Sequence, residues 1–353
     1  MTSLLDDVRN ALTNEAQQAI VKRQDPHALA RRIVRRRFRK QLSISGGLFV
    51  LMVGAFVGVR IVVDASMGLP GPPTVDASKK GEDVVSPPGK KGVIFTALTA
   101  DGEAQLYKAD TDGGDVRQVT EGRPSRSAAW SPDGSKLVLA RGSETNSRIF
   151  VMNADGSGLQ PLTDGPADFS PVFSSDGETI AFVRNVGGKD DIYLVGADGS
   201  GLRRLTSASG PEIQPAWSPD GSQLAYTASN PGDGNQAIHV INADGTGDRA
   251  VVDGPGSESA PVWSPSGEKL AFAREAADSD VADLWLTSFD DSQEERLTSG
   301  EEDERPRAWI RDHILFLRGE LGQWRGHVFD LSSGHSSQLI DAPIWGPDVS
   351  WRE

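Results

Sequence analysis

The chain has 353 residues, of which 50 are acidic and 36 basic, so its formal net charge at pH 7 is −14. This acidity argues against nucleic acid or an anionic membrane surface as the partner of most of the chain. The chain has no cysteine, which excludes disulfides and a lipid-modified cysteine as an anchor.

Residues 1–41 form a short basic segment with 10 Lys and Arg against 4 Asp and Glu, a net charge of +6. Ser3 and Asp6 suit a helix-capping box, and a second helix is predicted to begin near Asp25 and Pro26. The apolar residues of the first helix share one face, namely Leu5, Val8, Leu12, Ala16 and Ile20. Two interpretations remain open: a small surface helix beside a membrane, or a helix that docks on a cytoplasmic protein.

Residues 42–63 are predicted to span a membrane, because 42–59 contain no charge and the apolar run continues past Arg60. The arginine-rich sequence RRIVRRRFRK directly precedes this span, which places the N-terminus in the cytoplasm and the rest of the chain outside. A cleaved signal peptide is the alternative, with a cleavage site near Val63 to Ala65, but its basic region would be unusually long. Gly54 and Gly58 form a GxxxG motif, a weak indication of a homodimer.

Residues 64–91 contain five prolines together with Gly, Ser and Lys, a composition typical of an extended linker. This segment is expected to hold the following domain away from the membrane. The domain itself is predicted to occupy residues 92–353.

An aromatic residue recurs every 42 to 46 residues through this last segment. The six copies are Trp130, Phe173, Trp217, Trp263, Trp309 and Trp351. A fixed period of this length is typical of a repeat architecture in which each unit packs on the next.

Each repeat contains the signals of four short antiparallel strands. In the first four copies the aromatic residue is followed by a turn of the type SPDG, and then by a short apolar run such as Leu224-Ala225-Tyr226. A third run, such as Ile238-His239-Val240, ends at an Asp-Gly turn. A fourth strand is predicted to end in Leu-Thr, as at Leu162-Thr163. Four such strands form one blade of a β-propeller.

The two ends of the array predict how the ring closes. Residues from Val93 to Thr120 supply the second, third and fourth strands of a blade without a first strand, and the chain ends in a first strand around Trp351. We therefore expect an all-β, six-bladed propeller in which the C-terminal strand completes the first blade, because closure removes two exposed sheet edges.

The signatures PxWSPDGxxLAF and IYxMNADGSGxxxLT resemble those of TolB-like β-propellers, which are similar in shape to the WD-repeat proteins. The resemblance covers roughly residues 92 to 353 and is specific for the fold, whereas propellers host binding, scaffolding and catalysis. The order of helix, arginine cluster, membrane span and exported domain also resembles membrane-bound anti-sigma regulators of actinobacteria. The chain lacks the zinc-binding His/Cys motif of the commoner anti-sigma class.

The loops between the second and third strands differ in sequence from blade to blade, and we call the face that carries them the variable-loop face. Charged residues recur at equivalent positions of the repeats on this face. Four acids stand five residues before an aromatic residue, and four arginines end the second strand. They are Asp168, Glu212, Glu258 and Glu304, with Arg141, Arg184, Arg274 and Arg318. One interpretation is a set of acid–arginine clasps between neighbouring blades near the rim of the central channel. The other is a polar ring that binds the charged groups of a ligand; the arginines argue against a metal.

Other chemical signatures are weak. The acidic run from Asp290 to Glu304 does not match a calcium loop, and the propeller histidines have no ligand spacing. No G-x-S-x-G, P-loop or dinucleotide motif occurs, so neither an enzyme nor a cofactor is expected.

The sequence therefore predicts a membrane-anchored extracytoplasmic propeller that binds a protein, a peptide or a cell-envelope glycan. The variable loops are the expected recognition surface. A transmembrane regulator that contacts a cytoplasmic protein through residues 1–41 is the alternative, and an envelope hydrolase is a third option.

Overall fold

The computed structural model describes residues 92–352 except 111–115, 144, 231–233, 277–278, 280, 290–292, 320–323 and 345–348, with side chains described as far as residue 339. The predicted cytoplasmic segment, membrane span and linker lie outside these residues. Among the described residues, none belongs to a helix with the length and apolar character needed to cross a membrane.

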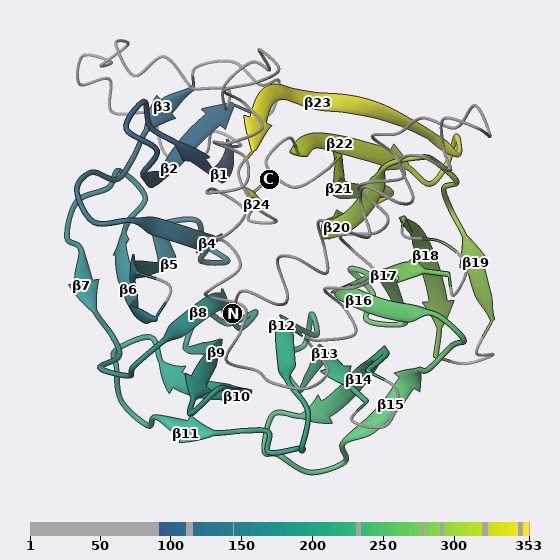
Figure 1. The fold of residues 1–353 in the computed structure, drawn as a ribbon, viewed down its shortest axis with the longest axis horizontal. Helices are drawn as coiled ribbons and strands as arrows, with labels where there is room; N and C mark the ends of the chain where they lie inside the picture. Colours follow the sequence, from purple (N-terminus) through teal and green to yellow (C-terminus); the bar gives the residue numbers. More distant parts are fainter. Residues whose placement is uncertain are drawn as a thin grey trace, which may run out of the picture. The chain divides into compact units, whose positions relative to one another are not determined.

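The described part of the chain forms six antiparallel sheets of four strands each. Figure 1 shows them arranged in a ring, with one strand of each sheet at the middle and one at the periphery. The prediction of an all-β, six-bladed propeller is thus confirmed. The blades are numbered 1 to 6 from the one that contains β1.

The strands occupy equivalent positions in all blades. The innermost strands are β24 (Val349–Arg352), β4 (Ser125–Trp130), β8 (Asp168–Phe173), β12 (Glu212–Trp217), β16 (Ser257–Trp263) and β20 (Asp303–Ile310). The second strands are β1 (Gly92–Leu98), β5 (Lys136–Ser143), β9 (Thr179–Val186), β13 (Gln223–Ser229), β17 (Lys269–Glu275) and β21 (His313–Gly319). The third strands are β2 (Ala104–Asp110), β6 (Asn146–Asn153), β10 (Lys189–Gly196), β14 (Gln236–Asn242), β18 (Ala282–Ser288) and β22 (Trp324–Asp330). The outer strands are β3 (Arg117–Gln118), β7 (Gln160–Pro161), β11 (Arg203–Arg204), β15 (Arg249–Val252), β19 (Glu294–Arg296) and β23 (His335–Ile344).

The repeated SPDG turns are stabilised by their own side chains. The hydroxyl of Ser131 donates to Asp133 Oδ1 at 2.6 Å and accepts from the backbone N–H of Lys136 at 2.9 Å. Gly134 has a φ of 65°, which glycine adopts without steric cost. The same pattern recurs at Ser174 and Ser218, so these turns connect the first and second strands in the same way from blade to blade.

Several outer strands are shorter than the sequence predicts. β7 contains only Gln160 and Pro161, and the predicted Leu-Thr end lies beyond it. The reason is that Thr163 Oγ1 accepts the backbone N–H of Ile149 at 2.9 Å, which replaces a ladder bond with a side-chain bond. Thr206 and Thr298 accept from the third strands of their own blades in the same manner.

The hydrophobic core consists of six clusters, one between each pair of neighbouring blades. The cluster between blades 6 and 1 packs Leu315 and Leu317 against Val93 and Phe95, all nearly inaccessible to solvent. β24 also pairs with β1, from Gly92 opposite Arg352 to Phe95 opposite Val349. The predicted closure of the ring by the C-terminal strand is therefore confirmed.

Candidate functional site

Three of the predicted acids each contact the arginine predicted with them. Asp168 accepts two bonds from Arg184, 2.7 Å from Nε and 2.9 Å from Nη2. The Nε atoms of Arg274 and Arg318 lie 2.8 Å from carboxylate oxygens of Glu258 and Glu304 respectively. The three carboxylates are buried, so each pair neutralises a charge that would be costly if left alone.

Each of the three arginines lies over an aromatic ring, and Arg184 and Arg274 also lie beside a glycine. The guanidinium of Arg184 is 5.4 Å from the ring centre of Phe182 and 5.1 Å from that of Tyr193. Arg274 lies 4.8 Å from the Trp285 ring, and a Cβ placed on Gly254 would meet its Nη2 at 2.6 Å. Acid and aromatic ring, with the glycine in blades 3 and 5, make up what we call the arginine site of a blade.

The acid–arginine pairs do not themselves connect neighbouring blades. The two residues of each pair stand opposite each other on the first and second strands of one blade, as Asp168 does with Arg184. The link to the preceding blade is made by a threonine. Thr163 donates to Asp168, and Thr298 donates to Glu304. In blades 3 and 6 the acid is therefore shared between its own arginine and the threonine of the blade before it.

Blades 2 and 4 depart from this arrangement. In blade 2 the acid is replaced by Ser125, whose hydroxyl accepts from Arg141 Nη1 at 2.9 Å. In blade 4 the arginine is replaced by Ala228, which stands opposite Glu212. Glu212 is 1% exposed, and burial raises its pKa although the Thr206 hydroxyl bonds to it. Six of the eight predicted residues thus form pairs, and Arg141 and Glu212 do not.

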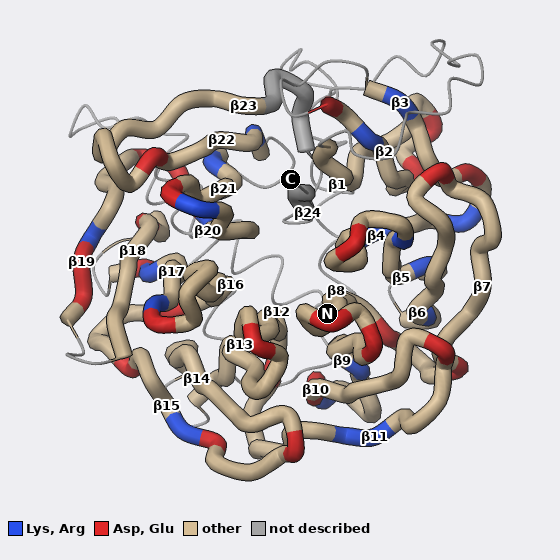
Figure 2. Tube along the Cα trace, turned by 180° about the vertical axis from the view of Figure 1, so that it is seen from behind, with Lys and Arg blue, Asp and Glu red and all other residues tan. Residues whose placement is uncertain are grey.

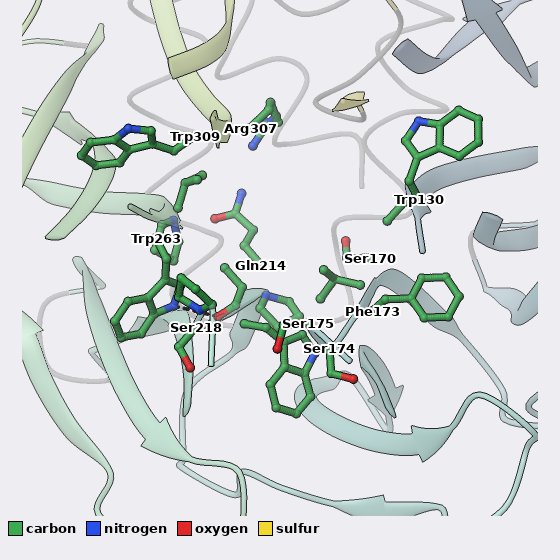
Figure 3. Close-up of a pocket in the computed structure, with 18 of the residues that line it drawn as sticks. Trp130, Ser170, Phe173, Ser174, Ser175, Gln214, Ser218, Trp263, Arg307 and Trp309 are labelled. Carbon is green, nitrogen blue, oxygen red and sulfur yellow. Dashed lines mark hydrogen bonds between the residues drawn. The ribbon is translucent and has the colours of Figure 1, made fainter. Parts of the chain in front are cut away.

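Between the inner strands of five blades lies a central cavity of about 540 Å³. It is lined by the middle and the end of β4, β8, β12, β16 and β20, together with the turns that follow the first four of these strands. The acids stand at or near the opposite end of these strands, so the cavity and the arginine sites are separate. Figure 3 shows Gln214 and Arg307 extending toward the middle of this cavity from different blades.

A β-bulge at the same position in successive inner strands shapes the cavity wall. Ser127, Ser170, Gln214 and Ala260 all have φ between 50° and 56°, which is unusual for residues other than glycine. The strand register shifts at each of them. Left-handed backbone of this kind costs on the order of 1 kcal/mol per residue, so its repetition at one level of the ring points to a requirement of the architecture or the site.

Gln214 indicates what the bulged backbone can bind. The N–H of Ala260 in blade 5 donates to the side-chain oxygen of Gln214 in blade 4 at 2.9 Å. The Thr227 hydroxyl donates to the same oxygen at 2.9 Å. An amide oxygen is therefore held at the cavity wall by a bulge N–H and a hydroxyl.

The aromatic residues of the repeat support the wall from behind. Figure 3 shows the rings of Trp130, Phe173 and Trp309 pointing away from the middle of the cavity. Trp130 and Phe173 are 8% and 6% exposed and belong to the cores between blades. Trp263 donates from Nε1 to the carbonyl of Ala216 in the preceding blade at 3.1 Å. Prolines and serines of the inner strands and turns also line the cavity, together with Trp217 and Trp309, which are partly exposed and pack against the cores between blades.

The cavity residues are absent from the sequence prediction. Three of the four bulged residues precede the repeated proline, at Pro171, Pro215 and Pro261. A residue before proline is ordinarily extended, so local preference gives no sign of a left-handed backbone there. The one sign of the bulge in the sequence is that a residue followed by proline recurs at the same position of three repeats.

The described residues contain no group of three or more His, Cys, Asp or Glu side chains able to hold a metal ion. His327 is buried, and burial together with Arg318 and Arg325 lowers its pKa to about 4. At neutral pH its imidazole is uncharged.

A family model described as the TolB beta propeller domain matches residues 73–210, 122–309 and 197–343. TolB from Acinetobacter baumannii is 18% identical with a TM-score of 0.64, and the match covers 82% of this chain and 69% of that one. A TolB-like protein from Agrobacterium tumefaciens is 21% identical with a TM-score of 0.58, over 75% of this chain and 98% of that one. An oligogalacturonate lyase in complex with manganese is 18% identical with a TM-score of 0.54, over 70% of this chain and 73% of that one. A comparison with curated proteins found no match. At these identities the solved structures establish the fold alone.

Proposed function

From the premise that the chain belongs to the family of TolB-type β-propeller domains, we propose that it is a membrane-anchored binding protein. Its propeller faces the outside of the cell and binds a protein or peptide of the cell envelope in the central cavity. The observation that supports this most directly is the cavity itself, about 540 Å³ between the inner strands of a closed ring. Volumes of this order are typical of ligand sites.

The rigidity of the ring favours binding without rearrangement. Buried clusters join all neighbouring blades, and the threonine–acid bonds add polar links between several of them. A preformed site loses little conformational entropy when a ligand binds. The proposal assigns no reaction to the propeller; turnover by the purified protein in a broad substrate panel would contradict it.

The membrane anchor is proposed from the apolar residues 42–63 and the arginines before them. A reporter that is active only outside the cytoplasm, fused after residue 91, tests the orientation. We expect activity from this fusion and none from a fusion after residue 41. The reverse result would contradict the proposed topology.

Site-specific photo-crosslinking in the native membrane tests where a partner binds. A crosslinking amino acid at Ser175, which is exposed and lines the cavity, is expected to capture an envelope protein or peptide. The matched control is Val186, which is 51% exposed at the end of β9 near the variable-loop face. Capture at Val186 but not at Ser175 would place recognition on the variable loops and contradict the cavity as the site.

The second candidate function is a transmembrane regulator, which the predicted helix and arginine cluster of residues 1–41 favour. Deletion of residues 2–24 separates the two functions. If transcription and cytoplasmic partners stay unchanged while the propeller still captures its ligand, the regulatory role is excluded.

A further inference from the structure

The charged residues of blades 3 and 5 balance one another at the variable-loop end of the sheet. In both blades an acid, an arginine, a second acid and a second arginine follow one another from the innermost to the outermost strand. The first three stand opposite one another in the strand register, and the second acid pairs with the outer arginine. The residues are Asp168, Arg184, Asp191 and Arg204 in blade 3, and Glu258, Arg274, Asp283 and Arg296 in blade 5. The charges of these four residues cancel in each blade.

Blade 2 has no acid at the same four positions. Arg141 stands between Ser125 on β4 and Arg148 on β6, which replace the two acids. Pro161 on β7 replaces the outer arginine. The four positions therefore carry two positive charges and no negative one. Like charges directly opposite each other destabilise a sheet, so Arg148 opposite Arg141 points to a role other than stability.

A third arginine comes from the connection between blades 1 and 2. Arg123 is exposed and follows Gly122, on which a Cβ would lie 3.7 Å from Nη2 of Arg141. The carbonyl of Gly122 accepts from Nε2 of Gln105 at 2.9 Å, which holds the connection in this place. Partial burial and the neighbouring Arg123 lower the pKa of Arg141 from its usual value. We call Arg123, Arg141 and Arg148 the arginine cluster.

The arginine cluster has donors available for a ligand. A guanidinium has five N–H donors, and Arg141 uses Nη1 for the Ser125 hydroxyl and Nη2 for the carbonyl of Glu121. None of the carboxylates in the described part of the chain forms an ion pair with an arginine of the cluster. Arg141 is partly exposed, and the other two arginines are exposed. The cluster is therefore accessible and lacks a counter-charge.

The surroundings make this site selective for anions. The chain has a net charge of −14, and Figure 2 shows acidic residues spread around the ring. An anionic segment is repelled by an acidic surface and attracted where cations gather, so it is directed to the cluster.

We propose that the arginine cluster binds an acidic segment of a partner protein, with an Asp or Glu side chain of that segment supplying the counter-charge that blade 2 lacks. A carboxylate is the anion favoured, because the equivalent positions of blades 3 and 5 hold carboxylates against arginine, as Asp168 is held 2.7 Å from Arg184. Guanidinium groups bind carboxylates in a bidentate geometry. The cluster lies at the variable-loop end of β5, whereas the central cavity is lined by the middle and the other end of the inner strands. The inference therefore goes beyond binding in the cavity and does not depend on it.

The test uses the full-length protein in detergent micelles and pools of random heptapeptides with both ends blocked. One pool contains Asp and Glu, a second has Asn and Gln in their places, and the retained peptides are quantified by mass spectrometry. At low salt we expect the acidic pool to be retained about tenfold or more above the neutral pool, with a decrease at high salt. Equal retention of the two pools overturns the inference. A third pool carries phosphoserine in the same places, and its retention without any preference for Asp and Glu would assign the cluster to phosphate and also overturn the inference.

Arg141→Gln and Arg148→Gln test the cluster, and Arg325→Gln is the matched control. Arg325 is exposed at the position of blade 6 equivalent to Arg148, but Arg318 opposite it already has an acid as its partner. We expect R141Q and R148Q each to lower the preference for the acidic pool about fivefold or more, and R325Q to keep it. The basic residues 31–40 are the same in every variant, so a difference between variants reports on the cluster. An unchanged preference in the double variant R141Q/R148Q overturns the inference.

Ser125→Asp supplies the missing acid within the chain. Ser125 is buried opposite Arg141, as Asp168 is opposite Arg184. S125D should therefore pair with Arg141 and lose most of the preference for acidic peptides, whereas Ser125→Asn, of the same size but uncharged, should keep it. A preference that survives in S125D, or that is lost equally in S125D and S125N, overturns the inference. Thermal unfolding of each variant shows that the comparison is made between folded proteins.

The cavity and the arginine cluster fail in distinguishable ways. If the crosslinker at Ser175 captures an envelope partner while the peptide pools show no preference, binding in the cavity stands and the inference is overturned. If the peptide preference is present and depends on Arg141 while Ser175 captures nothing, the inference stands and the cavity is not the site of binding.

Discussion

The guanidinium of Arg184 lies against Gly165, so closely that a Cβ on Gly165 would come within 3.0 Å of it. Real Cβ atoms do not approach other atoms so closely. The glycine at this position therefore provides the space that the arginine needs. Blade 4 supports this interpretation, because it has Ala208 in the corresponding connection and no arginine at Ala228.

Gly165→Ala is expected to destabilise the protein by about 1–3 kcal/mol, since the added methyl group overpacks the arginine site. Gly300→Ala is the matched control, because its Cβ would meet nothing closer than 3.9 Å. Chemical denaturation measures both. The explanation fails if G165A and G300A have the same stability. It also fails if Gly165→Ala destabilises the R184A variant, which lacks the arginine side chain, as much as it destabilises the wild type.

The pair Asp168 and Arg184 is expected to show strong coupling. Their side chains are 0% and 10% exposed, so Asp168→Ala leaves a buried arginine without its carboxylate and should cost about 3–5 kcal/mol. The double variant D168A/R184A should be less destabilised than the sum of the single variants. Arg148→Ala is the control, since Arg148 is exposed on β6 and its replacement should cost under about 1 kcal/mol. Additive effects at 168 and 184 would show that the pair is not coupled.

The buried carboxyl of Glu212 predicts how the stability of the folded protein changes with pH. Burial raises the pKa of this carboxyl in the folded protein above the value in the unfolded chain, which is about 4.3. The folded state therefore holds its proton more tightly. The stability that this group contributes is fully present below the unfolded pKa and is lost as pH rises through the folded pKa.

Glu212→Gln cannot lose a proton, so its stability relative to the wild type should increase as pH rises from about 4 toward neutrality. The melting temperatures of the two proteins across this range measure the difference. Glu304→Gln is the comparison, because Glu304 pairs with Arg318 and the substitution removes that charge pair. E304Q should melt below the wild type at neutral pH. If the melting temperatures of E212Q and the wild type differ by the same amount over the whole pH range, the pKa of Glu212 is not raised by folding.

How far the sequence predicts this molecule depends on whether a feature follows from spacing or from backbone geometry. The aromatic period and the turns predict six blades, and the incomplete blade at Val93 predicts that β24 pairs with β1. Spacing also aligns Asp168 with Arg184. Spacing does not reveal that the two residues stand directly opposite each other within one blade. Their pairing depends on the bulge between Phe169 and Val172, which shifts the register of β8 against β9.

The cavity could not be predicted because it depends on backbone conformation. The left-handed φ of Ser170 contradicts the usual preference of a residue before proline and is imposed by the strand arrangement. The contact of Gln214 with Ala260 joins residues 46 positions apart in different blades. Single-sequence reasoning places both residues on inner strands, but it gives neither the bulge nor the direction of the side chain.

Deletion of residues 349–353 is expected to weaken the ring without unfolding all of it. The deletion removes β24, so the β1 edge from Gly92 to Phe95 loses its partner strand. Val93 and Phe95 would still pack on Leu315 and Leu317, so blade 1 should stay attached to blade 6. Unpaired strand edges associate with other chains, so we expect a lower melting temperature together with dimers or larger species in size-exclusion chromatography. A synthetic peptide of residues 346–353 should restore the monomer and raise the melting temperature of the truncated chain, because the peptide supplies the missing strand. The same peptide with a proline in place of Ser350 is the control, since proline lacks the N–H needed for the ladder and Ser350 stands opposite Ile94 in the middle of the pairing. A truncated chain that stays monomeric and melts like the intact protein would show that the six-bladed ring does not depend on β24 for its closure.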